Sequence, residues 1–233
     1  MKFKVSILSI FLMLTFISSS HAATGLATEY KITMTKLELC ETGSTTANCL
    51  NPLTISPGTT SGQVDIASAS AGQSAGSYGN IAKAKIGTNY TYMQITMSRQ
   101  FQITGVAGSC ATKAGETGSK TADAKGLTGN IDDAGSSTLY VPDGTGYGDH
   151  MNGSVDALGS TVSNDTVIGS SDEYLQYRKI ITGGLTVEAN KFPTVKITFD
   201  MTNAVGEGTG GAAACTANVM YANEPGMTIS FVD

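Results

Sequence analysis

The sequence contains no tryptophan, only two histidines and few charged residues, which make up 14% of its 233 positions. One histidine is His21, at the end of an N-terminal apolar segment, so a histidine-based site further along would depend on His150 alone. A Ser–His–Asp triad needs a base held against a nucleophile, and the chain has no G-x-S-x-G motif. These absences argue against a histidine-dependent hydrolase and against a zinc centre.

Long apolar runs are missing after the first seventeen residues. Residues 5–17 are mostly apolar, follow Lys2 and Lys4, and lead into small residues that end at Ala22. This order is typical of a secretory signal peptide, and the run is shorter than the ~20 residues that a spanning helix needs. We therefore expect removal of residues 1–22, no membrane insertion, and export of residues 23–233 to the periplasm, the cell surface or the medium.

The chain also lacks an excess of basic residues. It has 14 Lys and Arg against 19 Asp and Glu, a net charge of −5. Removal of residues 1–22 takes away two lysines and no acid, which leaves 12 against 19, a net charge of −7. Nucleic acids and anionic membranes need a basic face, so neither is an expected partner.

Four cysteines are present, namely Cys40, Cys49, Cys110 and Cys215. An even number in an exported chain favours disulfides, and four cysteines allow three connectivities. We favour Cys40–Cys49, which encloses eight small or polar residues, together with Cys110–Cys215. A metal site is the rival interpretation, but the spacings do not include C-x-x-C.

Strand-like segments are numerous. Residues 90–104 form the clearest one, because apolar side chains share one parity there: Met93, Ile95, Met97, Phe101 and Ile103. Arg99 interrupts this apolar parity, which predicts a bulge or bend. Further strands are expected at residues 63–67, 81–86, 139–141, 195–201, 219–221 and 227–231, and two at 174–187, broken at Gly183 and Gly184. Residues 171–179 are the one plausible helix.

Residues 30–39 also read as a strand, but their apolar positions conflict. Tyr30, Ile32 and Met34 share one parity, whereas Leu37 and Leu39 share the other. A regular strand cannot bury both sets on one face. Either a bulge near Thr35 and Lys36 corrects the register, or the strand crosses between sheets, or its first half serves a neighbouring subunit.

This pattern predicts an all-β protein, an antiparallel β-sandwich of immunoglobulin-like or Greek-key type. Residues 23–233 would form one domain with irregular Gly-rich insertions at about 105–137 and 142–170. Residues 126–177 contain no Lys or Arg, and Asp143 and Asp149 flank flexible glycines. This stretch is either a solvated acidic loop or a Ca²⁺ site with Asp143 and Asp149 as ligands.

Two segments carry a family resemblance. "AKIGTNYTYMQITMSRQFQITG" (residues 84–105) resembles the part of secreted bacterial immunoglobulin-like or transthyretin-like sandwiches in which a glycine turn and a tyrosine lead into a long central strand. "FPTVKITFDMTNAV" (residues 192–205) is similar to their later core strand. The resemblance implies a β-sandwich without enzymatic activity and transfers no functional residue.

No catalytic constellation emerges, so we expect a structural or interaction protein, such as a filament or adhesin-like subunit that uses its terminal strands for β-augmentation. The expected contact residues are Glu29, Tyr30, Ile32 and Met34 in the first strand, and Tyr90 and Tyr92 on the polar parity of the strongest strand. The expected partner is a second copy. The alternative function is a secreted or periplasmic module that binds glycans or Ca²⁺ through its loops.

The calcium hypothesis makes a direct prediction. If Asp143 and Asp149 bind Ca²⁺, millimolar Ca²⁺ raises the melting temperature, because a ligand that binds only the folded state stabilises it. The double change Asp143→Ala and Asp149→Ala then abolishes the rise in a thermal melt. A rise that survives this change places the site elsewhere, and no rise at all refutes the calcium hypothesis.

Overall fold

The structure is a computed structural model that describes residues 23–56, 62–70, 81–108, 110–118, 131–141, 151–157, 159, 168–191, 194–207 and 220–232. These residues form mainly β-strands, with one short helix, α1 (Ile66–Ser70), and two 3₁₀ turns, η1 (Ile81–Lys83) and η2 (Ile131–Asp133). Every pairing between named strands is antiparallel. The predicted all-β antiparallel class is confirmed. No helix within the described ranges is long and apolar enough to cross a membrane.

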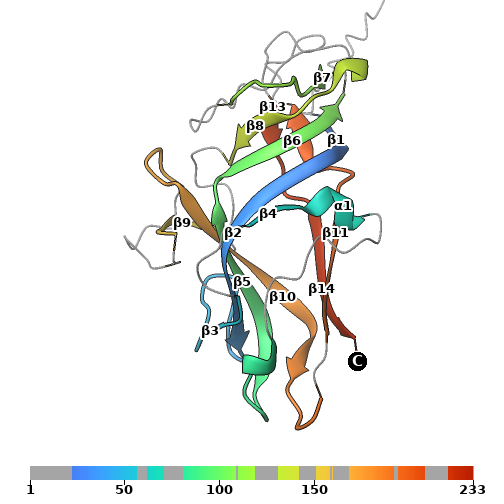
Figure 1. Cartoon of the computed structure of the whole chain (residues 1–233). Helices are drawn as coiled ribbons and strands as arrows, with labels where there is room; N and C mark the ends of the chain where they lie inside the picture. The colour runs from blue at the N-terminus through green and yellow to red at the C-terminus, as the bar shows by residue number, and fades with distance from the viewer. Residues whose placement is uncertain are drawn as a thin grey trace, which may run out of the picture.

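The long strand β2 (Ala27–Glu41) organises the largest sheet, which curls through the centre of Figure 1. Along one edge, β2 pairs with β5 (Asn89–Ser98) and then with β6 (Gln100–Ala107). Along its other edge it pairs with β3 (Leu53–Thr54) and β4 (Gly62–Asp65). Met34 demonstrates the two edges, because it lies opposite Met97 on one side and Gly62 on the other.

The sheet forks beyond β5 and β6. β5 pairs with β10 (Tyr174–Thr186), which in turn pairs with β9 (Met151–Val155). β6 pairs instead with β8 (Ser137–Tyr140) and β7 (Cys110–Ala111). Two small sheets complete the described fold: β1 (Thr24–Gly25), β12 (Val205–Glu207) and β13 (Met220–Ala222) form one, and β11 (Thr194–Asp200) and β14 (Gly226–Val232) form the other.

A β-bulge resolves the parity conflict in β2. Met34 pairs with Met97 and Lys36 with Thr96, so Thr35 is an extra residue on β2. The shift by one residue lets Ile32 and Leu37 both point into the core, where they are 5% and 4% exposed. The prediction of a bulge near Thr35 and Lys36 is confirmed.

Arg99 stands at the bend between β5 and β6, where a bulge or bend was predicted. Its backbone N–H donates to the Glu173 carbonyl before β10, and its carbonyl accepts from Val141 N–H after β8. Its side chain is fully buried and donates to three carbonyls, those of Val141 at 2.5 Å, Gly169 at 2.6 Å and Asp172 at 3.2 Å. Arg99 therefore fills the fork at which β8 and β10 separate.

Two local predictions are wrong. Residues 81–86 were expected to form a strand, but Ile81–Lys83 form the 3₁₀ turn η1. A second hydrogen-bonded turn, from Lys85 to Thr88, follows before β5 begins. Residues 171–179 were expected as a helix, but β10 begins at Tyr174 and continues to Thr186 with an irregularity between Ile180 and Leu185 in place of a break into two strands. Pairing with β5 outweighs the acidic helix-start signal at Asp172 and Glu173.

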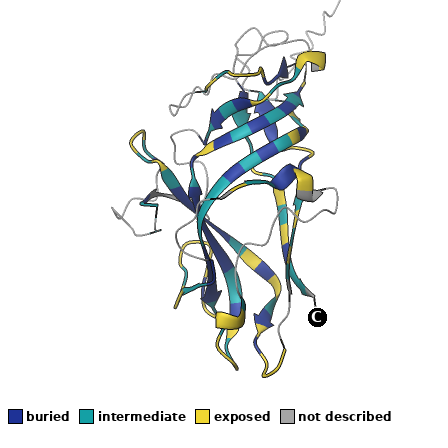
Figure 2. Cartoon of the chain, in the orientation of Figure 1, coloured by how far each residue is buried: buried dark blue, intermediate teal, exposed yellow. Residues whose placement is uncertain are grey.

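One hydrophobic core lies inside the curl of the large sheet. β6 alternates between buried positions and intermediate or exposed ones, whereas residues 93–97 of β5 and 175–178 of β10 are buried throughout (Figure 2). Its fully buried side chains come from strands far apart in sequence: Leu39, Met93, Ile103, Leu139, Leu175 and Ile229. β11 and β14 add Val195, Ile197, Phe199, Met227 and Phe231, which are partly buried against it.

The N-terminal segment pairs within its own chain. The carbonyls of Ala23 and Leu26 accept from Glu207 N–H and Val106 N–H, and Ala27 N–H donates to the Met201 carbonyl. A Cβ on Gly25 would meet the Val106 carbonyl oxygen at 1.9 Å, so only glycine allows this close packing of β1 on β6.

The predicted disulfide Cys40–Cys49 is present, with a Cα–Cα distance of 5.1 Å. Cys110 is disulfide-bonded as well. Cys215, its predicted partner, lies outside the described residues, and so do Asp143 and Asp149. The bridge at Cys40 closes a loop against β2.

The Arg99 corner predicts a large loss of stability in Arg99→Met. This change removes the side-chain donor of three carbonyls, one in a buried and two in a part-buried contact, and disruption of such a buried charged group typically costs about 3–5 kcal/mol. Urea denaturation of Arg99→Met measures this loss. Lys113→Met is the control, because Lys113 is 59% exposed in its ion pair with Glu116, and we expect it to cost at most about 1 kcal/mol. Equal effects of the two changes would contradict the role of Arg99.

Candidate interaction site

The outer face of β2, β5 and β10 carries three rows of side chains that cross the three strands. The register aligns one residue from each strand in every row. The rows are Lys36, Thr96 and Gln176; Glu38, Gln94 and Arg178; and Cys40, Tyr92 and Ile180. The first two rows are polar, although Glu38, Gln94, Thr96, Gln176 and Arg178 are all buried.

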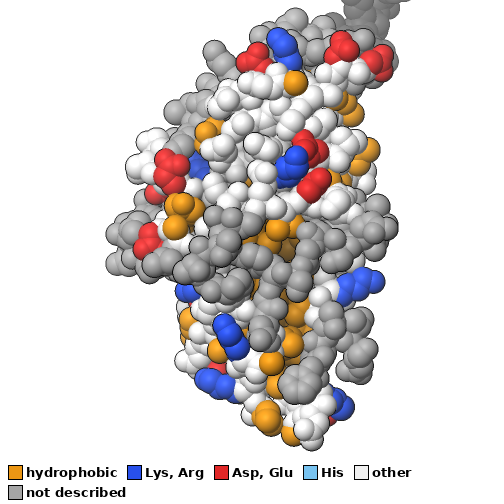
Figure 3. All heavy atoms as spheres, viewed as in Figure 1, with side chains coloured by type: hydrophobic (Ala, Val, Ile, Leu, Met, Phe, Trp, Pro, Cys, Tyr) orange, Lys and Arg blue, Asp and Glu red, His pale blue; other side chains and the backbone are white. Residues whose placement is uncertain are grey.

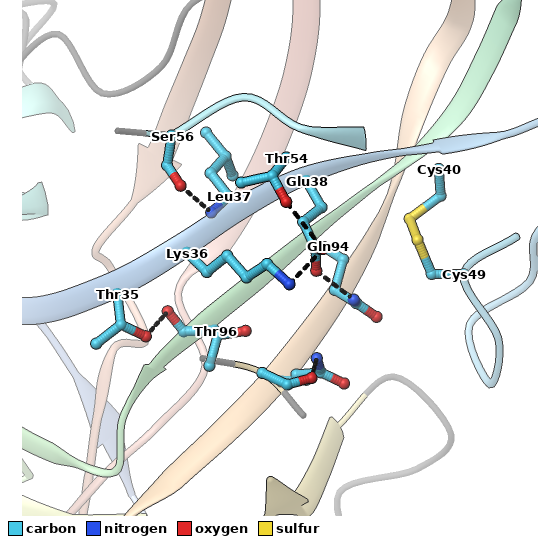
Figure 4. Close-up of polar contacts among 12 residues, drawn as sticks. Thr35, Lys36, Leu37, Glu38, Cys40, Cys49, Thr54, Ser56, Gln94 and Thr96 are labelled. Atoms are coloured by element: carbon cyan, nitrogen blue, oxygen red, sulfur yellow. Dashed lines mark hydrogen bonds and ion pairs between the residues drawn. A yellow bond between two sulfur atoms is a disulfide. The ribbon is translucent and has the colours of Figure 1, made fainter. Parts of the chain in front are cut away.

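A continuous chain of polar contacts joins these rows. Lys36 Nζ lies 2.7 Å from Glu38 Oε1, and Gln94 Nε2 donates to Glu38 Oε2 at 2.7 Å, as Figure 4 shows. Arg178 Nε donates to Gln94 Oε1 at 2.6 Å, and its NH2 group donates to Gln176 Oε1. The Glu38 carboxylate thus contacts Lys36 directly and is linked to Arg178 through the side-chain amide of Gln94.

Segments of the same chain cover this polar chain of contacts. Arg178 NH1 donates to the carbonyl of Thr46 in the disulfide-closed loop, and Gln176 Nε2 donates to the carbonyl of Gly159. Burial lowers the pKa of Arg178, and the negative charge of Glu38 opposes that effect. Because its donors reach acceptors of the same chain, we assign the network a structural role: it fixes the loops on the outer face.

Thr96 and Gly159 form a tight contact within this cover. Thr96 Oγ1 is buried and has no hydrogen-bond partner among the described residues. A Cβ on Gly159 would lie 2.6 Å from Thr96 Oγ1, and the φ of Gly159 is +72°, so glycine is required on both grounds. Glycine there lets the backbone of the segment after β9 lie directly on the sheet.

The third row is the exposed part of this face. Ile180 is 55% exposed and lies opposite Tyr92, which is half-buried. The pairing of β9 with β10 ends at Tyr177, so residues 178–180 and 185–186 of β10 pair with β5 alone within the described chain. An exposed apolar side chain beside a half-paired strand is a feature of interaction surfaces.

Three of the predicted contact residues are core residues instead. Tyr30 is 2% exposed, Ile32 is 5% and Tyr90 is 0%. The Tyr30 hydroxyl donates to the Asn223 carbonyl, and its pKa is raised by burial and by the charge of Glu224. The Tyr90 hydroxyl accepts from Lys85 N–H, because the 81–88 turn folds over the start of β5. Tyr30, Ile32 and Tyr90 are therefore not exposed on the surface of this chain, as contact residues would have to be.

The remaining predicted contact residues lie closer to the surface. Met34 packs partly buried against the core, and Tyr92 is half-buried on the outer face. Glu29 is bonded within its own chain to Lys31 and to Thr104 Oγ1, the latter at 2.9 Å. Burial acts to raise the pKa of Glu29, but hydrogen bonds from Lys31, Ser136 and Thr104 outweigh it and lower the pKa.

The C-terminal segments β11 and β14 were predicted as strands, but not as an isolated pair. The alternation of Val195, Ile197 and Phe199 was visible, but the open edges follow only from the structure. Within the described residues, β14 hydrogen-bonds as a strand to β11 alone. In the same ranges, no three His, Cys, Asp or Glu side chains gather as metal ligands.

Comparisons of the chain with protein-family models, with curated proteins and with solved structures found no match.

The polar network predicts that Glu38 matters far more than Glu41, although both lie on β2 and both pair with a lysine. Glu38→Ala removes the acceptor of Lys36 and Gln94 in a buried site, which should cost about 3–5 kcal/mol. Glu41 lies 3.5 Å from Lys85, whose side chain is 65% exposed, so Glu41→Ala should cost at most about 1 kcal/mol. Denaturant titration of both variants measures the difference, and similar losses would show that the network is not important for stability.

Proposed function

We propose that the protein is an exported, non-enzymatic structural subunit that assembles with copies of itself through β-augmentation at its C-terminal strand. The observation that carries this proposal is the isolated pair β11–β14, whose strands have no further strand partner within the described residues. Unpaired strand edges offer backbone donors and acceptors to another chain.

The composition of β14 supports this role. Met227, Ile229 and Phe231 face the core, whereas Gly226 and Thr228 are exposed. A two-stranded sheet is marginally stable by itself, so β11–β14 depends on packing against the core and gains from an added strand. The N-terminal strands are less suitable, because β1 pairs with β12 and the start of β2 pairs with β6 and β4.

The arrangement of the sheets in layers is part of the same proposal. We propose a β-sandwich of immunoglobulin-like type, in which the curled sheet is one layer and β11–β14 is the beginning of the second. Apolar residues of β11 and β14 pack toward the core that the curled sheet encloses, which supports two layers. A thin second layer leaves room for a strand from a neighbour.

The proposed location is the periplasm, the cell surface or the medium. The signal-like residues 1–22 and the disulfide Cys40–Cys49 support it, because disulfides persist in oxidising compartments.

Assembly should fail when the edge of β14 carries a charge. In Thr228→Lys, an exposed lysine on β14 opposes addition of a strand but leaves the core intact, so we expect at least ~10-fold weaker assembly. Sedimentation velocity and negative-stain electron microscopy of the mature chain measure it. Gln63→Lys is the control, because Gln63 is exposed on β4, another edge strand. A wild-type protein that stays monomeric at all concentrations refutes the proposed function.

A further inference from the structure

Charges of opposite sign gather at the two ends of the described structure. The bulge at Thr35 separates the strands that pair with the first part of β2 from those that pair with its second part. We call the region around β4, β6, β7, β8, η2 and β12 the acidic end. The basic end is the region around β3, β5, η1, residues 178–186 of β10 and the start of β11. Figure 3 shows red side chains mainly above and blue ones mainly below.

The basic end carries seven cations and four carboxylates within the described residues. The cations are Lys36, Lys83, Lys85, Arg178, Lys179, Lys191 and Lys196, and the carboxylates are Glu38, Glu41, Glu188 and Glu224, the last 3.8 Å from Lys179. At the acidic end six carboxylates accompany two cations. The carboxylates are Glu29, Asp65, Glu116, Asp132, Asp133 and Glu207, and the cations are Lys31 and Lys113. A chain with an overall net charge of −5 therefore has one end of positive sign.

The outermost charges at each end have no ion-pair partner in the described chain. Lys83 is exposed on η1, and Asp132 and Asp133 are exposed on η2. Lys85, by contrast, is 3.5 Å from Glu41, and Lys113 is 3.6 Å from Glu116. Charges that are not paired within the described residues are the ones that a partner would contact.

Apolar exposure coincides with the basic end. Ile86, three residues after Lys83, is 71% exposed, the highest value among the exposed large hydrophobic residues of the described chain. Hydrogen bonds between Gly87 N–H and the Val187 carbonyl, and between Val187 N–H and the Thr88 carbonyl, hold this turn against the end of β10. An exposed isoleucine in a hydrogen-bonded turn that also carries Lys83 and Lys85 suits a contact centre with a polar rim.

We propose that copies of this protein bind head to tail, with the basic end of one copy against the acidic end of the next. This inference rests on the proposed function and specifies its direction. The contact is heterologous, because two different surfaces meet, so repetition produces an open chain of subunits or a ring. β14 also ends at the basic end (Figure 1), so the contact brings the C-terminal strand toward the next copy.

Charge reversal tests this arrangement in the mature chain. Lys83→Glu with Lys85→Glu reverses the charges at η1 of the basic end, and Asp132→Lys with Asp133→Lys reverses those on η2 of the acidic end. Each double variant should self-associate at least ~10-fold more weakly than wild type, because like charges then face each other across the contact. A mixture of the two double variants should associate again, since opposite charges meet.

Sedimentation velocity at low and high salt measures these effects, because added salt screens exposed charges. Circular dichroism melts show whether each variant is folded, and Lys113→Glu with Glu116→Lys is a control that leaves the net charge of the acidic end unchanged. Recovery in the mixture is the decisive result, since a folding defect cannot produce it.

Two outcomes overturn the proposal while leaving the proposed function in place. In the first, both reversals assemble like wild type and Thr228→Lys does not. In the second, Lys83→Glu with Lys85→Glu abolishes binding to heparin or anionic vesicles but leaves self-association unchanged, which assigns the basic end to another partner. A wild-type chain that never associates overturns both proposals.

Discussion

One buried cation, Arg99, determines how the large sheet divides. A sheet that must continue along β10 on one side and along β8 on the other exposes backbone carbonyls at the fork, away from water. Buried carbonyls need donors, and a guanidinium offers several in a fixed geometry. Because Arg99 donates to Val141, Gly169 and Asp172, it joins the end of β8 to the segment that leads into β10. The curl of the sheet around the core therefore depends on a polar side chain.

The outer face is stabilised in a different way from the inner face. Inside the curl, apolar burial dominates, and the burial of each large side chain contributes ~1.5–3 kcal/mol. Outside, Glu38, Gln94 and Arg178 are buried but are bonded to each other, which avoids the cost of unpaired polar groups. The same network ties down Thr46 in the disulfide-closed loop. Specific bonds of this kind define the position of loops that apolar packing alone would leave free to slide.

Local pattern in the sequence was sufficient for part of this fold. The period of two in residues 90–104 predicted β5 and β6, and the breaks in parity at Thr35 and Arg99 predicted the bulge and the bend. Side chains whose neighbours are distant in sequence were not predictable. Tyr90 shares the parity of polar residues, yet the turn of residues 81–88 buries it, and Tyr30 is covered from Asn223. The opposed charged ends were likewise not predictable, since Lys83 and Asp132 lie on separate turns, η1 and η2, whose places follow from the three-dimensional fold.

Edge pairing and charge supply different parts of an assembly. Backbone hydrogen bonds along a strand are insensitive to sequence and do not by themselves choose between parallel, antiparallel or slipped neighbours. Opposite charge at the two ends excludes contacts between like ends and favours one direction of growth. Charged residues make up only 14% of the chain. Few other charges therefore compete with Lys83, Asp132 and Asp133 for the opposite charges of a neighbouring copy. In the proposed assembly, the low charge content and the separation of the charges therefore act together to favour one direction of growth.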